Sequence, residues 1–301
     1  MIRFNPLSKD PDEIERMWYV PPRPAPPKPG WALFSDDFVL EALQDCAFQP
    51  EKIQRGGKWA IISTFARICM TIAQALIMLF CMIPVISWGM YSLARGMPRN
   101  IAGFFVRGCY WKTKLGRLGV DTIIDQDVEF TNPKHIEIGS RCHIDRGVLM
   151  SVPDERGRIR MGDHSFVGPY SHIAGRGGVE IGDFVGISAR VHIYSVSNTP
   201  IRLDRPGELI TMSHTVHPDR QGTIEGPIRL EDYVIVGPFA TIMPNVTLGR
   251  GCVVHGYSEV GQSFPKFSVI SGHGRAKHQG WRRPAGLDPR LNEPAQGEQQ
   301  A

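Results

Sequence analysis

The sequence predicts a mainly β protein, a parallel β-solenoid of six-residue repeats, preceded by a helical and strongly apolar N-terminal segment. Glycine and proline are abundant, at 32 and 24 residues, which indicates many turns. No charged residue occurs from Ile68 to Ala94, which predicts an apolar helix. The decisive observation is a six-residue period of aliphatic side chains, unbroken at Leu230, Val236, Ile242, Leu248, Val254 and Val260.

The composition of the 301-residue chain is that of an ordinary globular protein, with 42% hydrophobic and 21% charged residues. The formal net charge of +4 is too small to indicate nucleic acid as a partner. Six scattered cysteines form no CxxC pair, so they predict neither a disulfide framework nor a zinc ribbon. A reducing compartment is the default expectation.

Residues 1–58 read as a proline-rich extension with a short helix. Residues 19–31 contain six prolines, which lack amide donors and favour an extended spacer. The stretch from Ser35 to Gln54 is expected to be helical, because Ser35, Asp36 and Asp37 supply capping oxygens and negative charge at its start.

Residues 59–117 read as an apolar, membrane-associated helical segment and a basic linker. The uncharged run 68–94 exceeds the ~20 residues that a bilayer core requires. Pro84 should kink the helix, which allows a hairpin on the membrane surface as well as a straight span. The alternative is a helix buried in an oligomer interface. Basic residues on the C-terminal flank favour an inner-membrane location with the C-terminal domain, residues 118–277, facing the cytoplasm.

Residues 118–277 carry the repeat. A strand and a turn every six residues wind the chain into a solenoid, in which each aliphatic side chain stacks on its equivalent one coil later. Glycines, together with Asn245, are expected at turns that need positive φ. The further aliphatic ladders are Ile138, Ile144 and Met150; Met161, Val167, Ile173 and Val179; and Ile181, Ile187 and Ile193. The glycines that follow the aliphatic residues are Gly139, Gly162, Gly168, Gly182, Gly237, Gly249 and Gly261.

These repeats resemble the hexapeptide-repeat acyltransferase family, and most closely its sugar and surface-polysaccharide O-acetyltransferases. The resemblance is strongest from Gly226 to Leu230 and in Pro244-Asn245-Val246-Thr247-Leu248-Gly249. It implies a left-handed parallel β-helix, a homotrimer, acetyl-CoA as co-substrate in a groove between two solenoids, and no metal. It also implies basic contacts for the phosphates of coenzyme A, and the candidates on the last coils are Arg250, Lys266, Arg275 and Lys277.

The six-residue period stops between 195 and 225, and this long loop resembles the one that shapes the active-site groove in the family. Acyl transfer to a hydroxyl needs a base and donors for the developing oxyanion. In the galactoside branch a histidine stands where this chain has Thr199. The candidate bases are therefore His217 and His214 in the loop, with His192 on an adjacent coil, whereas His172 and His255 look like coil surface. The candidate substrate contacts are Asn198, Thr199, Asp204 and Asp219.

The predicted function is a membrane-associated acyltransferase that moves acetyl from acetyl-CoA to a hydroxyl or amino group of a surface polysaccharide or its saccharide precursor, with membrane lipid contacted through 68–94. A non-catalytic trimeric scaffold is the alternative, because Thr199 cannot act as a base. A zinc lyase like the carbonic anhydrases of this solenoid type is disfavoured by the histidine spacing. The tail, 278–301, is expected to be disordered.

Overall fold

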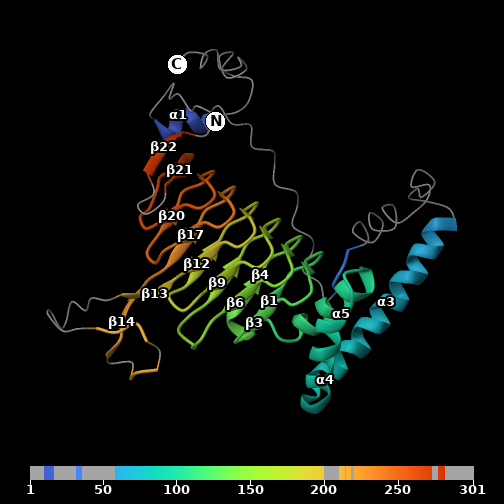
Figure 1. Ribbon diagram of the computed structural model, residues 1–301. Helices are drawn as coiled ribbons and strands as arrows, with labels where there is room; N and C mark the ends of the chain where they lie inside the picture. Colours follow the sequence, from blue (N-terminus) through green and yellow to red (C-terminus); the bar gives the residue numbers. More distant parts are fainter. Residues whose placement is uncertain are drawn as a thin grey trace, which may run out of the picture.

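Three parallel sheets wind around one core in the computed structural model, with helices at both ends of the solenoid (Figure 1). The structure describes residues 10–16, 32–35, 58–199, 210–213, 215–217, 220–272 and 277–281. The expected helix 35–54 therefore lies outside the described residues, apart from Ser35. The whole proline-rich spacer 19–31 and the tail beyond 281 also lie outside them.

The sheets are named by their order along each coil. The first sheet consists of β1 (Arg117–Leu118), β4 (Ile136–Ile138), β7 (Ile159–Met161), β10 (Val179–Ile181), β15 (Ile228–Leu230) and β18 (Thr247–Leu248). The second consists of β2 (Ile123–Ile124), β5 (His143–Ile144), β8 (Phe166–Val167), β11 (Gly186–Ile187), β16 (Ile235–Val236), β19 (Val253–Val254), β21 (Ser268–Ser271) and the antiparallel β22 (Lys277–Trp281). The third consists of β3 (Glu129–Thr131), β6 (Leu149–Ser151), β9 (His172–Ala174), β12 (His192–Tyr194), β17 (Thr241–Ile242) and β20 (Glu259–Val260).

The predicted parallel β-solenoid is confirmed, and every member of the aliphatic ladders is buried. Met161 pairs in register with Ile181, Ile181 with Leu230, and the next strand places Leu248 beside Leu230. Side chains of successive coils therefore stack along one core. The strand β22 continues four residues past 277, where the solenoid was expected to end.

The explanation expected for the glycines is wrong. The glycines that follow the aliphatic residues do not have positive φ, whereas thirteen non-glycine residues in the described part of the chain do, among them Phe184, Tyr233 and Asn245. A Cβ atom on Gly162 would lie 2.3 Å from the Asp183 carboxylate and 2.7 Å from the backbone of the next coil. Apart from Gly261, at which a Cβ would meet nothing within 4 Å, these glycines are needed because neighbouring coils approach too closely for a side chain, not because the turn is left-handed.

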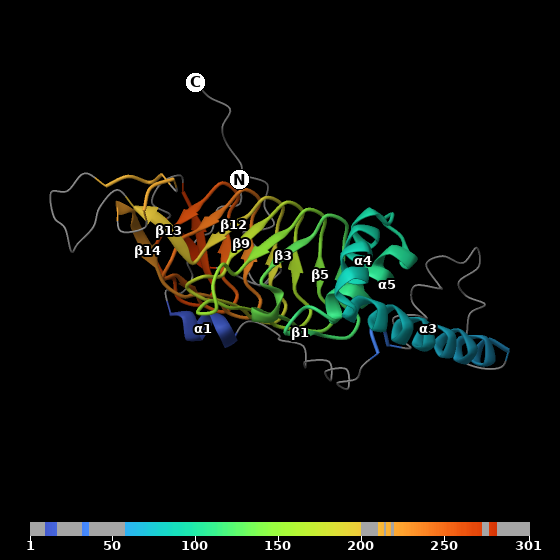
Figure 2. The ribbon, with the colours of Figure 1, turned by 90° about the horizontal axis from the view of Figure 1, so that it is seen from below.

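The described helices are α1 (Pro11–Arg16), α3 (Lys58–Met82), α4 (Pro84–Gly96), α5 (Ile101–Lys112) and a 3₁₀ turn, η2 (Pro133–His135). The expected break at Pro84 is present, because α3 ends at Met82 and α4 begins at Pro84. Figure 2 shows α4 and α5 beside the first coil, with α3 extending away from the solenoid. Within the described residues, no helix combines the length and apolarity needed to cross a bilayer.

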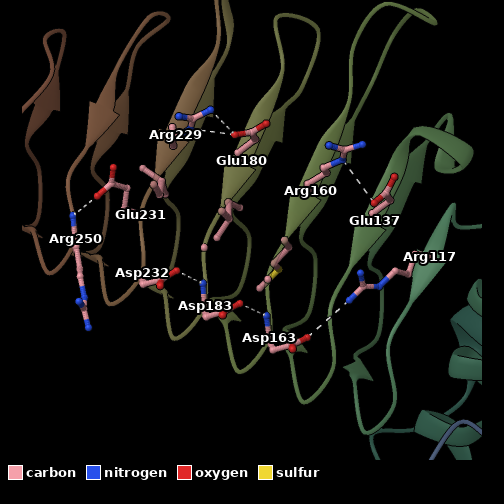
Figure 3. Close-up of a pocket in the computed structure, with 15 residues that line it drawn as sticks. Arg117, Glu137, Arg160, Asp163, Glu180, Asp183, Arg229, Glu231, Asp232 and Arg250 are labelled. Atoms are coloured by element: carbon pink, nitrogen blue, oxygen red, sulfur yellow. Dashed lines mark hydrogen bonds and ion pairs between the residues drawn. The ribbon is translucent and has the colours of Figure 1, made fainter. Parts of the chain in front are cut away.

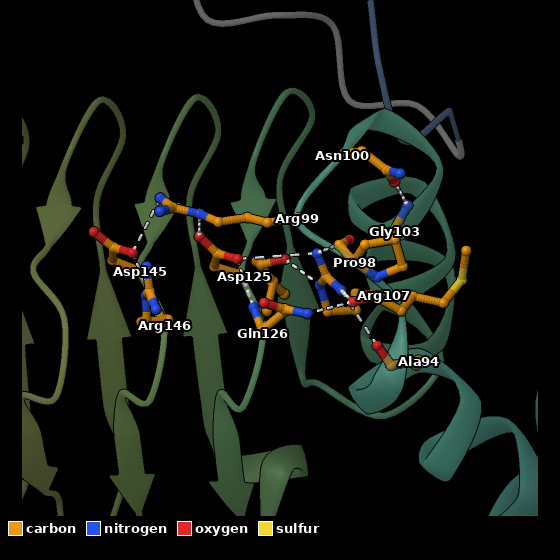
Figure 4. A network of polar contacts seen from close by, with 12 residues as sticks. Ala94, Pro98, Arg99, Asn100, Gly103, Arg107, Asp125, Gln126, Asp145 and Arg146 are labelled. Atoms are coloured by element: carbon orange, nitrogen blue, oxygen red, sulfur yellow. Dashed lines mark hydrogen bonds and ion pairs between the residues drawn. The ribbon is translucent and has the colours of Figure 1, made fainter.

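Two arginines fix the helices to the first coils (Figure 4). Arg107, 1% exposed, donates to the carbonyl oxygens of Ile124 and Met97 at 3.0 and 2.8 Å, which joins α4, α5 and β2. Burial lowers the pKa of Arg107, and the nearby Asp125 opposes this shift. Arg99 forms ion pairs with Asp125 and Asp145. Among the described residues, this pair of carboxylates and His143 form the one cluster with metal-ligand geometry, and a guanidinium already pairs with both acids.

Candidate active site

Two histidines lie side by side on the outer face of the third sheet. His172 on β9 and His192 on β12 are register partners, and each directly precedes a buried isoleucine. Because side chains alternate along a strand, both imidazoles point away from the core. Ser151 lies on the preceding strand, β6, and Tyr194 lies two residues after His192.

These four side chains, Ser151, His172, His192 and Tyr194, are called here the histidine cluster. The Ser151 Oγ lies 3.2 Å from His172 Nε2, and the Tyr194 hydroxyl lies 3.0 Å from His192 Nδ1. The Tyr194 ring meets His172 edge-on at 5.3 Å and stacks on His192 at 5.5 Å. Both rings are thus held in fixed orientations by hydrogen bonds and aromatic contacts.

The protonation of the cluster follows from its burial. Burial lowers the pKa of His172, and the neighbouring His192 lowers it further, because two positive imidazoliums repel each other. Burial also raises the pKa of Tyr194, so its hydroxyl keeps its proton. The cluster therefore offers a neutral imidazole that can accept a proton near pH 7.

The long loop leaves the solenoid directly after this cluster. Its base is an antiparallel hairpin of β13 (Val196–Thr199) and β14 (Gly222–Glu225). Ser195, fully buried, fixes the exit point, because its Oγ donates to the Ala174 carbonyl oxygen at 2.6 Å and accepts from the Gly177 amide at 2.9 Å. Figure 1 shows the hairpin projecting from the side of the solenoid near β12.

The structure describes some of the loop residues that were predicted to form the site and leaves others outside the described part of the chain. Asn198 donates from Nδ2 to the Met212 carbonyl oxygen at 3.3 Å, and Thr199 pairs across the hairpin with Gly222. His217 is exposed. The remaining predicted loop residues, His214, Asp204 and Asp219, lie outside the described residues. Of the three candidate bases, only His192 is shown beside a second imidazole.

His172, expected on the coil surface, does lie on the outer face of a coil, and the structure adds that it is paired in register with His192. The signal was present: His172-Ile173 and His192-Ile193 repeat the same dipeptide one coil apart. Equal positions in successive coils stack in one column, so the repeat alone brings these two side chains together. His255 does not share this column, because it follows β19 of the second sheet.

Two of the four residues predicted to contact coenzyme A, Arg250 and Lys266, form ion pairs with the N-terminal helix α1. Arg250 Nη1 lies 3.0 Å from Glu15 Oε1, and Lys266 forms ion pairs with Glu15 and Asp12. These contacts bring α1 onto the last coils, more than 230 residues away in sequence. The hydrogen bonds that Lys266 Nζ donates to the Asp12 and Glu15 carboxylates raise the pKa of Lys266. Arg275 lies outside the described residues, and Lys277 begins β22.

A shallow cavity of about 620 Å³ lies on a different face, along the first sheet (Figure 3). Its side chains alternate in charge from strand to strand, in the order Arg117, Glu137, Arg160, Glu180 and Arg229. Neighbours form ion pairs, for example Arg229 with Glu180 at 2.9 Å and Arg160 with Glu137 at 3.6 Å. The charges compensate one another, so this cavity is a weaker candidate site than the histidine cluster.

Comparison with known proteins agrees with this architecture. The family model "Bacterial transferase hexapeptide (six repeats)" matches residues 227–262. A dTDP-4-amino-4,6-dideoxy-D-glucose acyltransferase of Escherichia coli is 30% identical over 156 residues, which is 52% of this chain and 77% of the relative. A Mycobacterium tuberculosis protein named "Probable acetyltransferase Rv3034c" is 27% identical over 173 residues, 54% of this chain and 53% of that protein.

Among solved structures, AntD from Bacillus cereus has a similar fold. This N-acyltransferase, in complex with dTDP and 3-hydroxybutyryl-CoA, has a TM-score of 0.50 and 25% identity, and the match covers 57% of this chain and 86% of that chain. The same family is indicated by the six-residue period, by the three-sheet solenoid and by these relatives. The chain belongs to the hexapeptide-repeat acyltransferase family.

Proposed function

We propose that this protein transfers an acyl group from acyl-CoA, with acetyl-CoA as the predicted donor, to the sugar of a nucleotide-linked sugar. The relatives in Escherichia coli and Bacillus cereus support this class of acceptor, because their names and ligands contain dTDP or its 4-amino-4,6-dideoxyglucose conjugate. Such a nucleotide sugar is also a precursor of the kind predicted for a surface polysaccharide.

The histidine cluster carries the proposed chemistry. The acceptor nitrogen or oxygen attacks the thioester carbonyl carbon and gives up its proton to the neutral imidazole of His172 or to the ring of His192. The C–S bond then breaks, coenzyme A leaves as a thiolate, and the proton passes from the imidazolium to that sulfur. An amine acceptor fits this site as well as a hydroxyl, since an imidazole serves both.

A homotrimer belongs to the same proposal. The family groove lies between two solenoids, and the hairpin β13–β14 projects from the solenoid beside the histidine cluster, where a second copy is able to provide the opposite wall. Light scattering during gel filtration tests this, because a trimer has three times the 33.6 kDa chain mass.

The direct test supplies acetyl-CoA with dTDP-4-amino-4,6-dideoxyglucose and, separately, with the matched dTDP-6-deoxyglucose, which carries a hydroxyl at C4. Thiol release and the product mass report transfer to each acceptor. Transfer to the amine alone assigns N-acylation, and transfer to both assigns a broader acceptor range. Absence of transfer and of acetyl-CoA binding by calorimetry, in a folded trimer, would instead favour the scaffold alternative.

A further inference from the structure

The helices beside the first coil carry an unusual concentration of exposed apolar side chains. Of the twenty large hydrophobic residues exposed in the described part of the chain, twelve lie between residues 65 and 93. They form what is called here the apolar ridge: Phe65, Ile68, Ile72, Leu76, Leu79 and Phe80 on α3, Met82 and Ile83 at the bend, and Val85, Ile86, Trp88 and Leu93 on α4. Single exposed hydrophobic residues are normal on protein surfaces, but a continuous group of this size marks an interaction surface.

The ridge differs from the exposed face of an ordinary amphipathic helix. Among the residues of α3 and α4 whose burial the structure describes, the buried ones are Gln74, Cys81, Ser87 and Ala94, which are polar or small. Gln74 uses its Oε1 to accept a hydrogen bond from the Leu33 amide at 3.1 Å. Ile77, Met78, Met90 and Tyr91 pack half-buried against the core, whereas the twelve side chains of the ridge are exposed. A helix with polar residues inside and apolar residues outside is suited to a surrounding medium that is itself apolar.

The most exposed side chains gather at the bend between the two helices. Val85 is 84% exposed, Trp88 77% and Met82 72%, the three highest values among the exposed large hydrophobic residues. Ile83 separates the helices in an extended conformation, and Pro84 begins α4. The bend is thus an apolar tip, and its tryptophan is the residue type enriched where acyl chains meet lipid head groups.

The charges around the ridge indicate which apolar medium it meets. Residues 52–120 contain ten Lys and Arg and no Asp or Glu, whereas the rest of the chain, with 24 basic and 30 acidic residues, is net negative. Arg95 and Arg99 follow the ridge directly and keep nearly half of their side-chain surface exposed beside their ion pairs. An apolar tip with a cationic flank complements an anionic bilayer surface.

We propose that the apolar ridge attaches this protein to the surface of an anionic membrane, with the α3–α4 bend inserted among the lipid acyl chains. A second copy of the chain is a poorer occupant, because it would bring two strongly cationic segments together. A protein interface also needs a polar rim, and the run from Ile68 to Ala94 has no charged residue. The membrane proposal does not depend on the proposed acyl transfer, since lipid binding needs neither substrate.

The test is flotation of the full chain with vesicles of phosphatidylcholine alone or with about one third phosphatidylglycerol. We expect binding to the anionic vesicles, weaker binding to the neutral ones, and partial release by salt. The variant Val85→Glu/Trp88→Glu should lower the partition coefficient at least about tenfold, because acidic groups are strongly disfavoured among acyl chains. The matched control is Tyr257→Glu, an aromatic-to-acid change at a 57% exposed site on the solenoid, which should bind like the unsubstituted protein.

A second measurement keeps the proposal testable if the double variant does not fold. Lipids brominated in the acyl chains should quench tryptophan fluorescence of the bound protein, and the conservative Trp88→Phe should bind normally but lose most of that quenching. Equal flotation of the double variant and the unsubstituted protein would overturn the proposal. So would an absence of flotation together with a higher oligomer that Val85→Glu/Trp88→Glu dissolves, because the ridge would then join copies of this chain.

Discussion

At the scale of single residues, the protonation of His172 decides whether the histidine cluster is able to accept a proton. Its Nε2 lies 3.2 Å from Ser151 Oγ, and its burial keeps the imidazole neutral. We expect His172→Gln to lower kcat by about 10² to 10⁴, the usual contribution of general-base catalysis, without changing the oligomeric state. Thiol release from acetyl-CoA measures this.

The comparison variant is His217→Gln, which removes the base that the sequence analysis favoured. His217 is exposed on the loop, and its replacement should leave kcat within a few-fold of the original value if the cluster provides the base. The reverse result, a large loss in His217→Gln and none in His172→Gln, would move the base to the loop.

His192 should help to set the pH range in which His172 is able to act as a base. Burial is the larger cause of the lowered His172 pKa, and His192 contributes the rest of the lowering. The rate should fall as the pH drops through the His172 pKa, because the protonated ring cannot act as a base. Removing the second imidazole in His192→Gln raises the His172 pKa, so the acid limb of kcat/KM should move to higher pH. An acid limb that stays in place, in an active His192→Gln enzyme, would exclude this coupling.

At the scale of elements, the close approach of successive coils sets which residues the turns tolerate. A Cβ on Gly162 meets the next coil at 2.3 Å, whereas a Cβ on Gly261 meets nothing within 4 Å. Gly162→Ala should therefore lower the free energy of unfolding by about 1–3 kcal/mol, the usual range for overpacking. Gly261→Ala is the matched control and should change it by less than about 0.5 kcal/mol. Urea denaturation at fixed protein concentration compares them, and equal losses would refute the spacing argument.

The helix α1 places carboxylates on the two basic groups predicted to bind coenzyme A. If Arg250 and Lys266 contact its phosphates, the Asp12 and Glu15 carboxylates compete for the same charges. Asp12→Asn/Glu15→Gln should then lower the Kd for acetyl-CoA, measured by calorimetry, and more at low than at high salt. An unchanged or raised Kd would place the phosphates elsewhere. The neighbouring Glu13→Gln, which has no described contact to either basic group, is the control.

Some elements of this fold could be predicted from the sequence and others could not. The solenoid was predictable, because one buried aliphatic per six residues is a local pattern that survives in every coil. The handedness was implied only by the family resemblance, since a period carries no hand. The ion pairs of Arg250 and Lys266 with α1 were not predictable, because no periodic pattern joins residues so far apart in the chain. The role of Gly162 was missed because its constraint lies between coils and not in its own turn.

At the scale of the whole molecule, two half-buried histidines link folding to pH. Burial is the main cause of the lowered pKa of both His143 and His172. Each has a folded pKa below its unfolded value near 6.5, so between those values the unfolded chain binds more protons than the folded one. The free energy of unfolding should therefore be independent of these groups above about pH 6.5 and fall as the pH drops below it.

Urea denaturation at pH 7.5 and pH 5.5 measures this loss. Both measurements use one protein concentration, because dissociation of the proposed oligomer would otherwise add its own concentration dependence. The variant His143→Gln/His172→Gln should lose less stability between these pH values than the unsubstituted protein, since neither glutamine titrates. The control variant His135→Gln/His255→Gln replaces two histidines elsewhere on the solenoid, one in η2 and one directly after β19, and it should keep the original pH dependence. If the two double variants show the same slope, the acid sensitivity arises from other groups, of which the ion pairs that join the helices to the first coils are the next to test.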